Sequence, residues 1–143
     1  MLFRSDVVDP LTGERVAGAL GEDGSSLLDS EEILIGESAG MKNRFVSNTT
    51  IGVVATNAAL SKPQAAKVAS MAHNGYARTL RPAHTMFDGD TIFSLATGTT
   101  VADVNVVGLL AARVMERAVV AAIRSATSLC GLKSWSDLRT DAN

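Results

Sequence analysis

The chain has 143 residues, 46% of them hydrophobic and 20% charged, with a net charge of -2 at pH 7. These values predict one soluble, cytoplasmic domain, and they exclude both a disordered chain and a protein basic enough to bind nucleic acid. The charged N-terminus is unlike a secretory signal, and the apolar stretches are too short to cross a membrane. The single cysteine, Cys130, indicates a reducing compartment and is expected to be buried at the end of an apolar helix.

The first third of the chain predicts little regular structure. Residues 10 to 30 are rich in Gly, Ser and acidic residues and are expected to be loop, with at most a short strand near Arg15 to Leu20. Glu32 to Ile35 is a further candidate for a short strand. The β-branched run from Thr50 to Thr56 is typical of a strand that is covered on both faces.

A helix is expected shortly after this strand. Ser61 is placed to cap it, and Pro63 falls in its first turn, where a missing N–H is tolerated. Alanines and larger apolar residues, Tyr76 among them, then recur at helical spacing until about Leu80. The Arg81-Pro82 pair ends the pattern.

The C-terminal part predicts a hairpin and a long helix. Residues 85–87 and 91–96 flank Asp88-Gly89-Asp90, which favours a strand, a tight turn and a second strand. From about Val101 to Thr127 the residues predict a helix whose apolar part needs cover from a sheet or a partner. The polar C-terminal tail is expected to be frayed. This order of elements predicts an α/β layered domain, with helices packed on a mixed sheet.

A serine motif precedes the first long strand. Residues 36–40 read Gly-Glu-Ser-Ala-Gly and match the nucleophile elbow of α/β-hydrolases, with Ser38 as the nucleophile. That arrangement requires a helix directly afterwards, and then an acid followed by a histidine. A polar segment and a strand follow instead, and no acid lies between Ser38 and either His73 or His84. A glycine-flanked turn is therefore the favoured interpretation.

The histidines do not predict a metal centre. His73 and His84 are eleven residues apart, and with the one cysteine they lack the usual spacing of metal ligands. No phosphate-binding glycine loop is recognisable either, so neither a metal nor another cofactor is predicted. His84 is interpreted as a structural residue or as part of the wall of a substrate pocket.

The polar residues before the strand suggest a different chemistry at Asn48 and Thr49. A threonine at a chain terminus combines a hydroxyl nucleophile with an α-amino base whose pKa is about 8. Such a terminus arises when the threonine hydroxyl attacks the preceding carbonyl and water hydrolyses the resulting ester. At the first residue of a buried strand the new terminus would be held rigidly. The alternative is an ordinary strand entry, because an Asn-Thr pair is common by chance.

Longer patterns extend this hypothesis. They are NTTIGVVATNAAL, a Lys-Pro-Gln-Ala helix, HNGYARTLRPAHT and MFDGDTIFSLATG. Together they resemble the processed C-terminal subunit of the nylon-oligomer hydrolases, the endo-type 6-aminohexanoate-oligomer hydrolases within the DmpA-type N-terminal-nucleophile peptidase family. The resemblance covers about Val46 to Ala126. It implies a partial αββα sandwich, autocleavage between Asn48 and Thr49, and a homo-oligomer of processed heterodimers.

The resemblance also implies a catalytic site. Thr49 matches the family nucleophile, and Asp88 and Asp90 match two carboxylates close to it. The aminopeptidase relatives usually carry Ser at the nucleophile position and lack the FDGD signature, so this chain resembles the amidase branch. The spacing agrees, because side chains two residues apart on an extended backbone face the same way. The alternative is a hairpin turn in which both acids are solvated.

One part of the family pattern is unmatched. Family members carry a much longer segment before the processing bond, and it contributes a lysine, a tyrosine and an asparagine to the site. Only 48 residues precede Thr49. We therefore expect an N-terminally truncated chain, with residues 1–48 as the remnant of the upstream (α) subunit and residues 49–143 as the nucleophile-bearing (β) subunit.

Three functions are compatible with these residues. The first is a self-processing amidase that hydrolyses linear aliphatic amides, such as nylon oligomers, through an acyl-enzyme. The second is an aminopeptidase for β- or L-amino-acid amides within the same family. The third is a non-catalytic assembly subunit, because the apolar helix after residue 101 needs cover that so short a chain does not provide.

Overall fold

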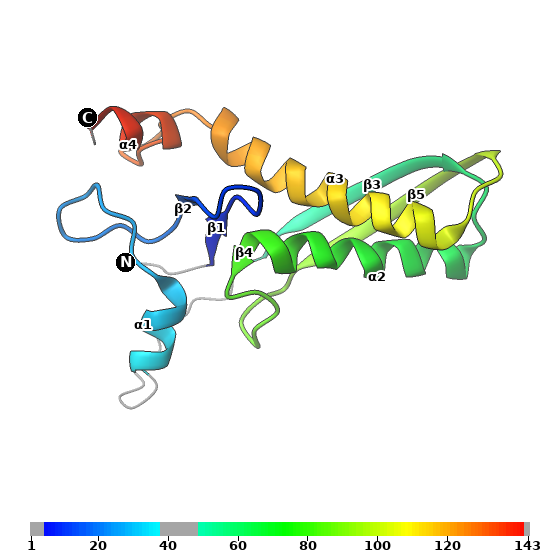
Figure 1. Cartoon of the computed structure of the whole chain (residues 1–143), viewed down its shortest axis with the longest axis horizontal. Coiled ribbons are helices and arrows are strands. Elements are labelled where there is room, and N and C mark those ends of the chain that lie inside the picture. The colour runs from blue at the N-terminus through cyan, green and yellow to red at the C-terminus, as the bar shows by residue number, and fades with distance from the viewer. Residues whose placement is uncertain (1–4, 38–48, 142–143) are drawn as a thin grey trace.

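The computed structural model describes residues 5–37 and 49–141 (Figure 1). This part of the chain has the mixed α/β architecture that the sequence predicts, and Ser38 and Asn48 lie outside it. None of its helices combines the length and the apolar character that a membrane crossing requires. In chain order the elements are β1 (Asp6–Val8), β2 (Arg15–Ala17), α1 (Ser30–Glu37), β3 (Ile51–Ala58), α2 (Lys62–Thr79), β4 (Leu80–Arg81), β5 (Thr91–Thr100), α3 (Val104–Ser125) and α4 (Trp135–Asp141).

Strands β3 and β5 form a two-stranded parallel sheet, in which Ile51 lies opposite Thr91 and Thr56 opposite Ala96. The prediction of a hairpin is therefore wrong, and residues 85–87 lie in an irregular turn rather than in a strand. Parallel strands need a long crossover connection, and α2 forms the main part of it. Figure 1 shows α2 and α3 packed side by side along this sheet.

The described residues cover one face of this sheet. Along β3, Gly52 and Val54 are buried, whereas Ile51 and Val53 are each more than half exposed. Phe93 of β5 is exposed on the same side as these two residues. The prediction of a strand covered on both faces is wrong for this part of the chain, because α2 and α3 both pack on the same side.

Helix α2 begins as its sequence predicts. The Ser61 hydroxyl accepts a hydrogen bond from the Gln64 backbone N–H, and the Gln64 side chain accepts one from the Ser61 N–H. This capping box satisfies N–H groups that the start of a helix leaves free. Helix α3 is capped by Asp103, whose carboxylate accepts from the N–H groups of Asn105 and Val106. Local sequence therefore determines where both long helices start.

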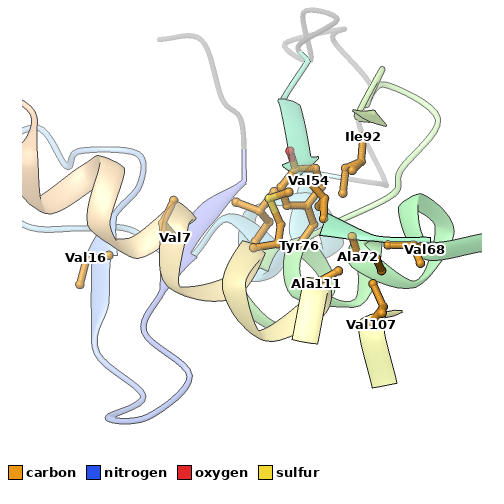
Figure 2. Close-up of a cluster of buried hydrophobic side chains, with 12 residues drawn as sticks. Val7, Val16, Val54, Val68, Ala72, Tyr76, Ile92, Val107 and Ala111 are labelled. Atoms are coloured by element: carbon orange, nitrogen blue, oxygen red, sulfur yellow. The ribbon is translucent and has the colours of Figure 1, made fainter. Parts of the chain in front are cut away.

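The two long helices approach each other closely at Gly75. A Cβ atom at this position would lie 2.6 Å from the Ala112 carbonyl oxygen and 2.8 Å from the Met115 Cβ. Only glycine leaves room for this contact. Figure 2 shows side chains of the neighbouring core, among them Ala72 and Tyr76 of α2 and Ala111 of α3. Val68 and Tyr76 of α2 belong to the same core cluster and are almost fully buried.

A smaller sheet has the strand order β2-β1-β4, with antiparallel pairing throughout. The strand expected near Arg15 is confirmed as β2. The pairing of Asp6 with Arg81 joins the N-terminal region to the segment after α2. The Asp6 carboxylate is fully buried, where it accepts hydrogen bonds from the Ser30 N–H and hydroxyl and lies 2.9 Å from the Arg15 Nε.

Residues 32–35 are part of helix α1, so the prediction of a strand there is wrong. The reason lies just upstream, where the Asp29 carboxylate accepts hydrogen bonds from the N–H groups of Glu31 and Glu32. An acceptor at this position satisfies the first N–H groups of a helix and favours helical over extended backbone. The apolar run of three residues does not outweigh this cap.

The C-terminal segment is helical, contrary to the expectation of a frayed tail. Trp135 of α4 lies beside the guanidinium groups of Arg124 and Arg139, with 5.3 and 5.0 Å between the guanidinium carbons and the ring centroid. The expectation that Cys130 is buried is also wrong. Helix α3 ends at Ser125, and Cys130 is exposed in a turn with φ 53° beside Gly131.

Candidate active site at the start of strand β3

Thr49 lies just before strand β3 and is exposed. Its neighbour Thr50 is fixed through both of its backbone polar groups. The Thr50 N–H donates to the Asp90 carboxylate at 2.7 Å, and the Thr50 carbonyl accepts from the Thr91 N–H at 2.9 Å. The structure therefore places an accessible threonine next to a firmly held point of the sheet.

The register of the parallel sheet brings Asp90 to this point. Because Ile51 lies opposite Thr91, the residues that precede them, Thr50 and Asp90, also meet across the two strands. They are 40 positions apart in the sequence. Of the two acids that the sequence singles out, Asp90 is thus the one in contact with the residue that follows Thr49.

Asp88 makes different contacts. Its Oδ2 accepts hydrogen bonds from the N–H and the hydroxyl of Thr85 at 2.8 and 2.9 Å, and its own N–H donates to the Thr85 carbonyl at 3.1 Å. Asp88 therefore closes the loop that leads to Asp90. The sequence predicts that both acids lie beside Thr49, one binding it directly and the other orienting it. In the structure Asp88 binds Thr85, and Asp90 binds Thr50.

The two histidines lie together next to this loop. His73 of α2 and His84 of the loop approach to 3.3 Å between Nδ1 and Nε2, and their ring centroids are 5.3 Å apart. Burial lowers the pKa of His73 first, the nearby His84 lowers it further, and the Asp90 charge acts in the opposite direction. In the sequence, the spacing of the two histidines bears only on a metal centre, which it does not predict. Their pairing depends on the path of the loop after α2, which no local pattern reveals.

A pocket of about 620 Å³ extends from the same point of β3. It is lined by Thr50 and the first four residues of β3, by α3 and by the region of β1 and β2, and nearly all of these side chains are small or apolar. The polar lining residues are Ser5, Thr50 and Tyr76, which are uncharged. Such a volume is typical of a site for a small molecule. Tyr76, whose ring Figure 2 shows among the core side chains, was expected from the sequence only as a core residue.

The described ranges show no cluster of metal ligands. No three side chains of His, Cys, Asp or Glu in residues 5–37 and 49–141 lie close enough together to hold a metal ion. The chemical groups that do gather at the start of β3 are a threonine, a carboxylate that binds the adjacent backbone, and an uncharged pocket. These are groups suited to nucleophilic attack on a carbonyl carbon.

Comparison with known proteins connects this arrangement to a family. A family model described as peptidase family S58 matches residues 12–135, which include Thr49, Asp88, Asp90 and both histidines. The chain belongs to peptidase family S58. The sequence resemblance to the peptidase family as a whole is therefore confirmed. The resemblance to its nylon-hydrolase branch stays a prediction.

Mycobacterial members of the same family are similar over most of the chain. Uncharacterized aminopeptidases of Mycobacterium tuberculosis and Mycobacterium bovis are each 37% identical over 152 residues, covering 93% of the chain and 44% of the relative. One from Mycobacterium leprae is 40% identical over 145 residues, covering 91% of the chain and 40% of the relative. The chain spans less than half the length of these relatives.

Proposed function

We propose that this protein is the nucleophile-bearing part of an amide-bond hydrolase that cleaves itself between Asn48 and Thr49. The observation that carries the proposal is the hydrogen bond from the Thr50 N–H to Asp90. It fixes the backbone on one side of Thr49 and places a carboxylate near the new terminus. Membership of peptidase family S58 supports the reaction class.

The proposed processing step needs no additional reactant except water. The Thr49 hydroxyl attacks the Asn48 carbonyl carbon, the bond from that carbon to the Thr49 nitrogen breaks, and the nitrogen takes up the hydroxyl proton. Water then hydrolyses the resulting ester, which restores the hydroxyl and leaves Thr49 with a free α-amino group. This amine is the base for later turnovers, in which the hydroxyl attacks the substrate carbonyl and an acyl-enzyme forms. Asp90 would orient the ammonium form of that terminus.

The substrate we propose is a linear aliphatic amide, with oligomers of 6-aminohexanoate as the favoured class. The pocket beside Thr50 supports this choice, because its lining is apolar and carries no charged side chain. A chain of methylene groups gains free energy by leaving water for such a pocket. A charged group would lose its hydration there without a partner.

A second candidate is an aminopeptidase, which the names of the mycobacterial relatives favour. In that case the free amine of the substrate would need a carboxylate, and the candidate is Asp90, which binds the residue after the proposed nucleophile. The two activities are separable with a matched pair of amides, one with a free terminal amine and one with that amine acetylated. An aminopeptidase loses activity on the acetylated compound, whereas an endo-acting amidase retains it.

We further propose that the exposed face of the β3–β5 sheet binds an upstream subunit, and that processed pairs assemble into a homo-oligomer. The side chains on this face are apolar and more than half exposed: Ile51, Val53, Phe93 and Leu95. Apolar residues gathered in this way usually mark an interface. The portion of the relatives that this chain does not span is the proposed occupant. A chain that binds this partner but neither cleaves itself nor hydrolyses amides would be the non-catalytic assembly subunit that the sequence also allows.

The deciding experiment is the intact mass of the purified chain, alone and co-expressed with the portion of a mycobacterial relative that it does not span. We expect a 95-residue fragment that begins at Thr49 and ends at residue 143. Thr49→Ala should abolish it. Thr50→Ala is the matched control, because it removes a neighbouring hydroxyl and keeps the N–H that Asp90 binds. If no fragment forms in either setting, or if Thr49→Ala is still cleaved, the proposal is wrong.

A further inference from the structure

We propose that His73 and His84 form a proton-sensitive clamp that positions Asp90 against the start of strand β3. The two histidines are positioning residues, since they act through Asp90 and not on a substrate. The inference deepens the proposed function by assigning a regulation to the same site. It rests on that function for its biological meaning, but its structural part can be tested separately.

The contact between the two imidazole rings depends on which of their nitrogens carry a hydrogen. The His73 Nδ1 and the His84 Nε2 lie 3.3 Å apart, so one nitrogen must carry a hydrogen and the other must accept it. This is possible when both rings are neutral or when they share one additional proton. When both rings are fully protonated, two N–H groups point at each other and two positive charges repel. The contact therefore holds only above a certain pH.

The backbone of His84 adopts a conformation that needs support from its surroundings. His84 has φ 58°, a left-handed conformation that is uncommon for a residue with a side chain. Such a conformation persists where contacts hold it in place. The contact with His73 is one that acts on His84 directly, and it anchors the loop to α2.

The loop connects His84 to Asp90 at the start of β3. Thr85 and Asp88 close the loop through their mutual hydrogen bonds. Asp90, at the end of the loop, holds the Thr50 N–H. The segment from residue 84 to residue 91 is attached to α2 through the histidines and to itself through Asp88. It is attached to β3 through the Asp90 carboxylate and through the Thr91 N–H, which donates to the Thr50 carbonyl. Releasing the contact between the histidines gives the loop freedom to withdraw the Asp90 side chain from the Thr50 N–H.

The groups around His73 set the direction of its pKa shift. The charged or titratable groups that act on it are His84 from the loop and Asp90 from the segment before β5. On its own helix, Tyr76 presents its ring at 5.6 Å in an edge arrangement. Burial and His84 together lower the pKa of His73 below its ordinary value of 6.5, although Asp90 opposes this shift. The lowered pKa favours the neutral form of His73, in which the clamp is closed.

We test the clamp by NMR on the full-length Thr49→Ala chain, which stays intact whether or not the wild type cleaves itself. The chain has two histidines, so the ring signals belong to His73 and His84 alone. Between pH 8 and pH 5 the Thr50 amide signal should move with the same midpoint as the ring signals of His73. A Thr50 amide that does not respond to histidine protonation would overturn the inference.

His73→Gln and His84→Gln are the decisive variants, because glutamine can both donate and accept a hydrogen bond but does not titrate. In each of them the Thr50 amide should lose its response in the histidine range and keep a wild-type position near neutral pH. Dispersed spectra and the circular dichroism signal show whether each variant is folded. If the Thr50 amide still titrates in the same range in the double variant, the clamp does not exist.

A second measurement connects the clamp to processing. If the wild type forms the fragment, its rate of formation should fall on the acidic side of the pH profile, and His84→Gln should move this limb by at least about half a pH unit. An unchanged limb contradicts the inference. A chain that never cleaves itself refutes the proposed function, while the NMR titration still decides the clamp.

Discussion

Two regions of the molecule are stabilised by different interactions. One is the layer of α2, α3, β3 and β5, and the other is the N-terminal region of β1, β2 and α1. In the layer, apolar side chains and a close helix contact at Gly75 form the core. In the N-terminal region, the central interaction is a buried carboxylate, Asp6, that binds Ser30 and Arg15. Figure 1 shows the strands of the smaller sheet at one end of the long helices.

The difference has a physical consequence for how each region tolerates change. Apolar packing is spread over many contacts, so its weak points are places where no extra atom fits. A buried carboxylate concentrates the interaction in one group, and its removal leaves several donors without an acceptor. The two regions should therefore respond differently to substitution, to pH and to salt.

The largest expected effect is that of Asp6→Ala. Losing a buried, paired carboxylate should lower the free energy of unfolding by about 3–5 kcal/mol. Hydrogen exchange should show faster exchange of the β1 amides than of the α2 amides. Glu22→Ala, at an exposed position on the following loop, is the control and should change little. If α2 loses protection to the same extent as β1, the two regions form a single cooperative unit.

Gly75→Ala should have the next largest effect. The new Cβ would lie 2.6 Å from the Ala112 carbonyl oxygen, so α2 and α3 must move apart. We expect a loss of about 1–3 kcal/mol, measured by urea unfolding. The matched control is Gly36→Ala in α1, where no atom lies within 4 Å of the new Cβ. Equal effects of the two substitutions would contradict the importance of the helix contact.

Acid should weaken the two regions in different pH windows. The pKa of His73 is lowered from 6.5 by burial and by His84, so the unfolded chain binds the proton more tightly. The contribution of His73 to the free energy of unfolding is complete above about pH 6.5 and decreases as the pH falls below that value. The pKa of Asp29 is lowered from 3.8, mainly by the hydrogen bond from the Glu32 N–H. The contribution of Asp29 to the free energy of unfolding is therefore lost only below about pH 3.8. Urea unfolding across the pH range, followed in wild type and His73→Gln, should show the upper step in the wild type alone.

The smallest expected effect concerns α4. Arg139 forms an exposed ion pair with Glu14 at 2.7 Å and lies beside Trp135. Arg139→Gln should lower the free energy of unfolding by about 0.2–1 kcal/mol, because solvent screens such a pair. High salt should remove most of the difference between the variant and the wild type. Salt at 1 M shortens the Debye length to about 3 Å, so the ion pair is then largely screened. If the variant and the wild type still differ in stability, the contact of Arg139 with the Trp135 ring is responsible instead.

Local patterns predicted the two long helices well. The Ser61 and Pro63 signals define the start of α2, and the apolar run after residue 101 defines α3, because caps and helical spacing act over a few residues. The same local reasoning failed at α1, where a cap at Asp29 outweighs a short apolar run. It also failed at Cys130, because the helix ends earlier than the apolar pattern indicates.

What the sequence by itself determined is the two long helices, the strands β3 and β5 as extended segments, and the candidate residues Thr49, Asp88 and Asp90. The tertiary structure alone decided that β5 runs parallel to β3, that Asp90 rather than Asp88 reaches Thr50, and that His73 meets His84. The physical reason is the range of the interactions. Caps and helical periodicity are encoded among near neighbours, whereas strand register and loop path depend on contacts between residues far apart in the chain.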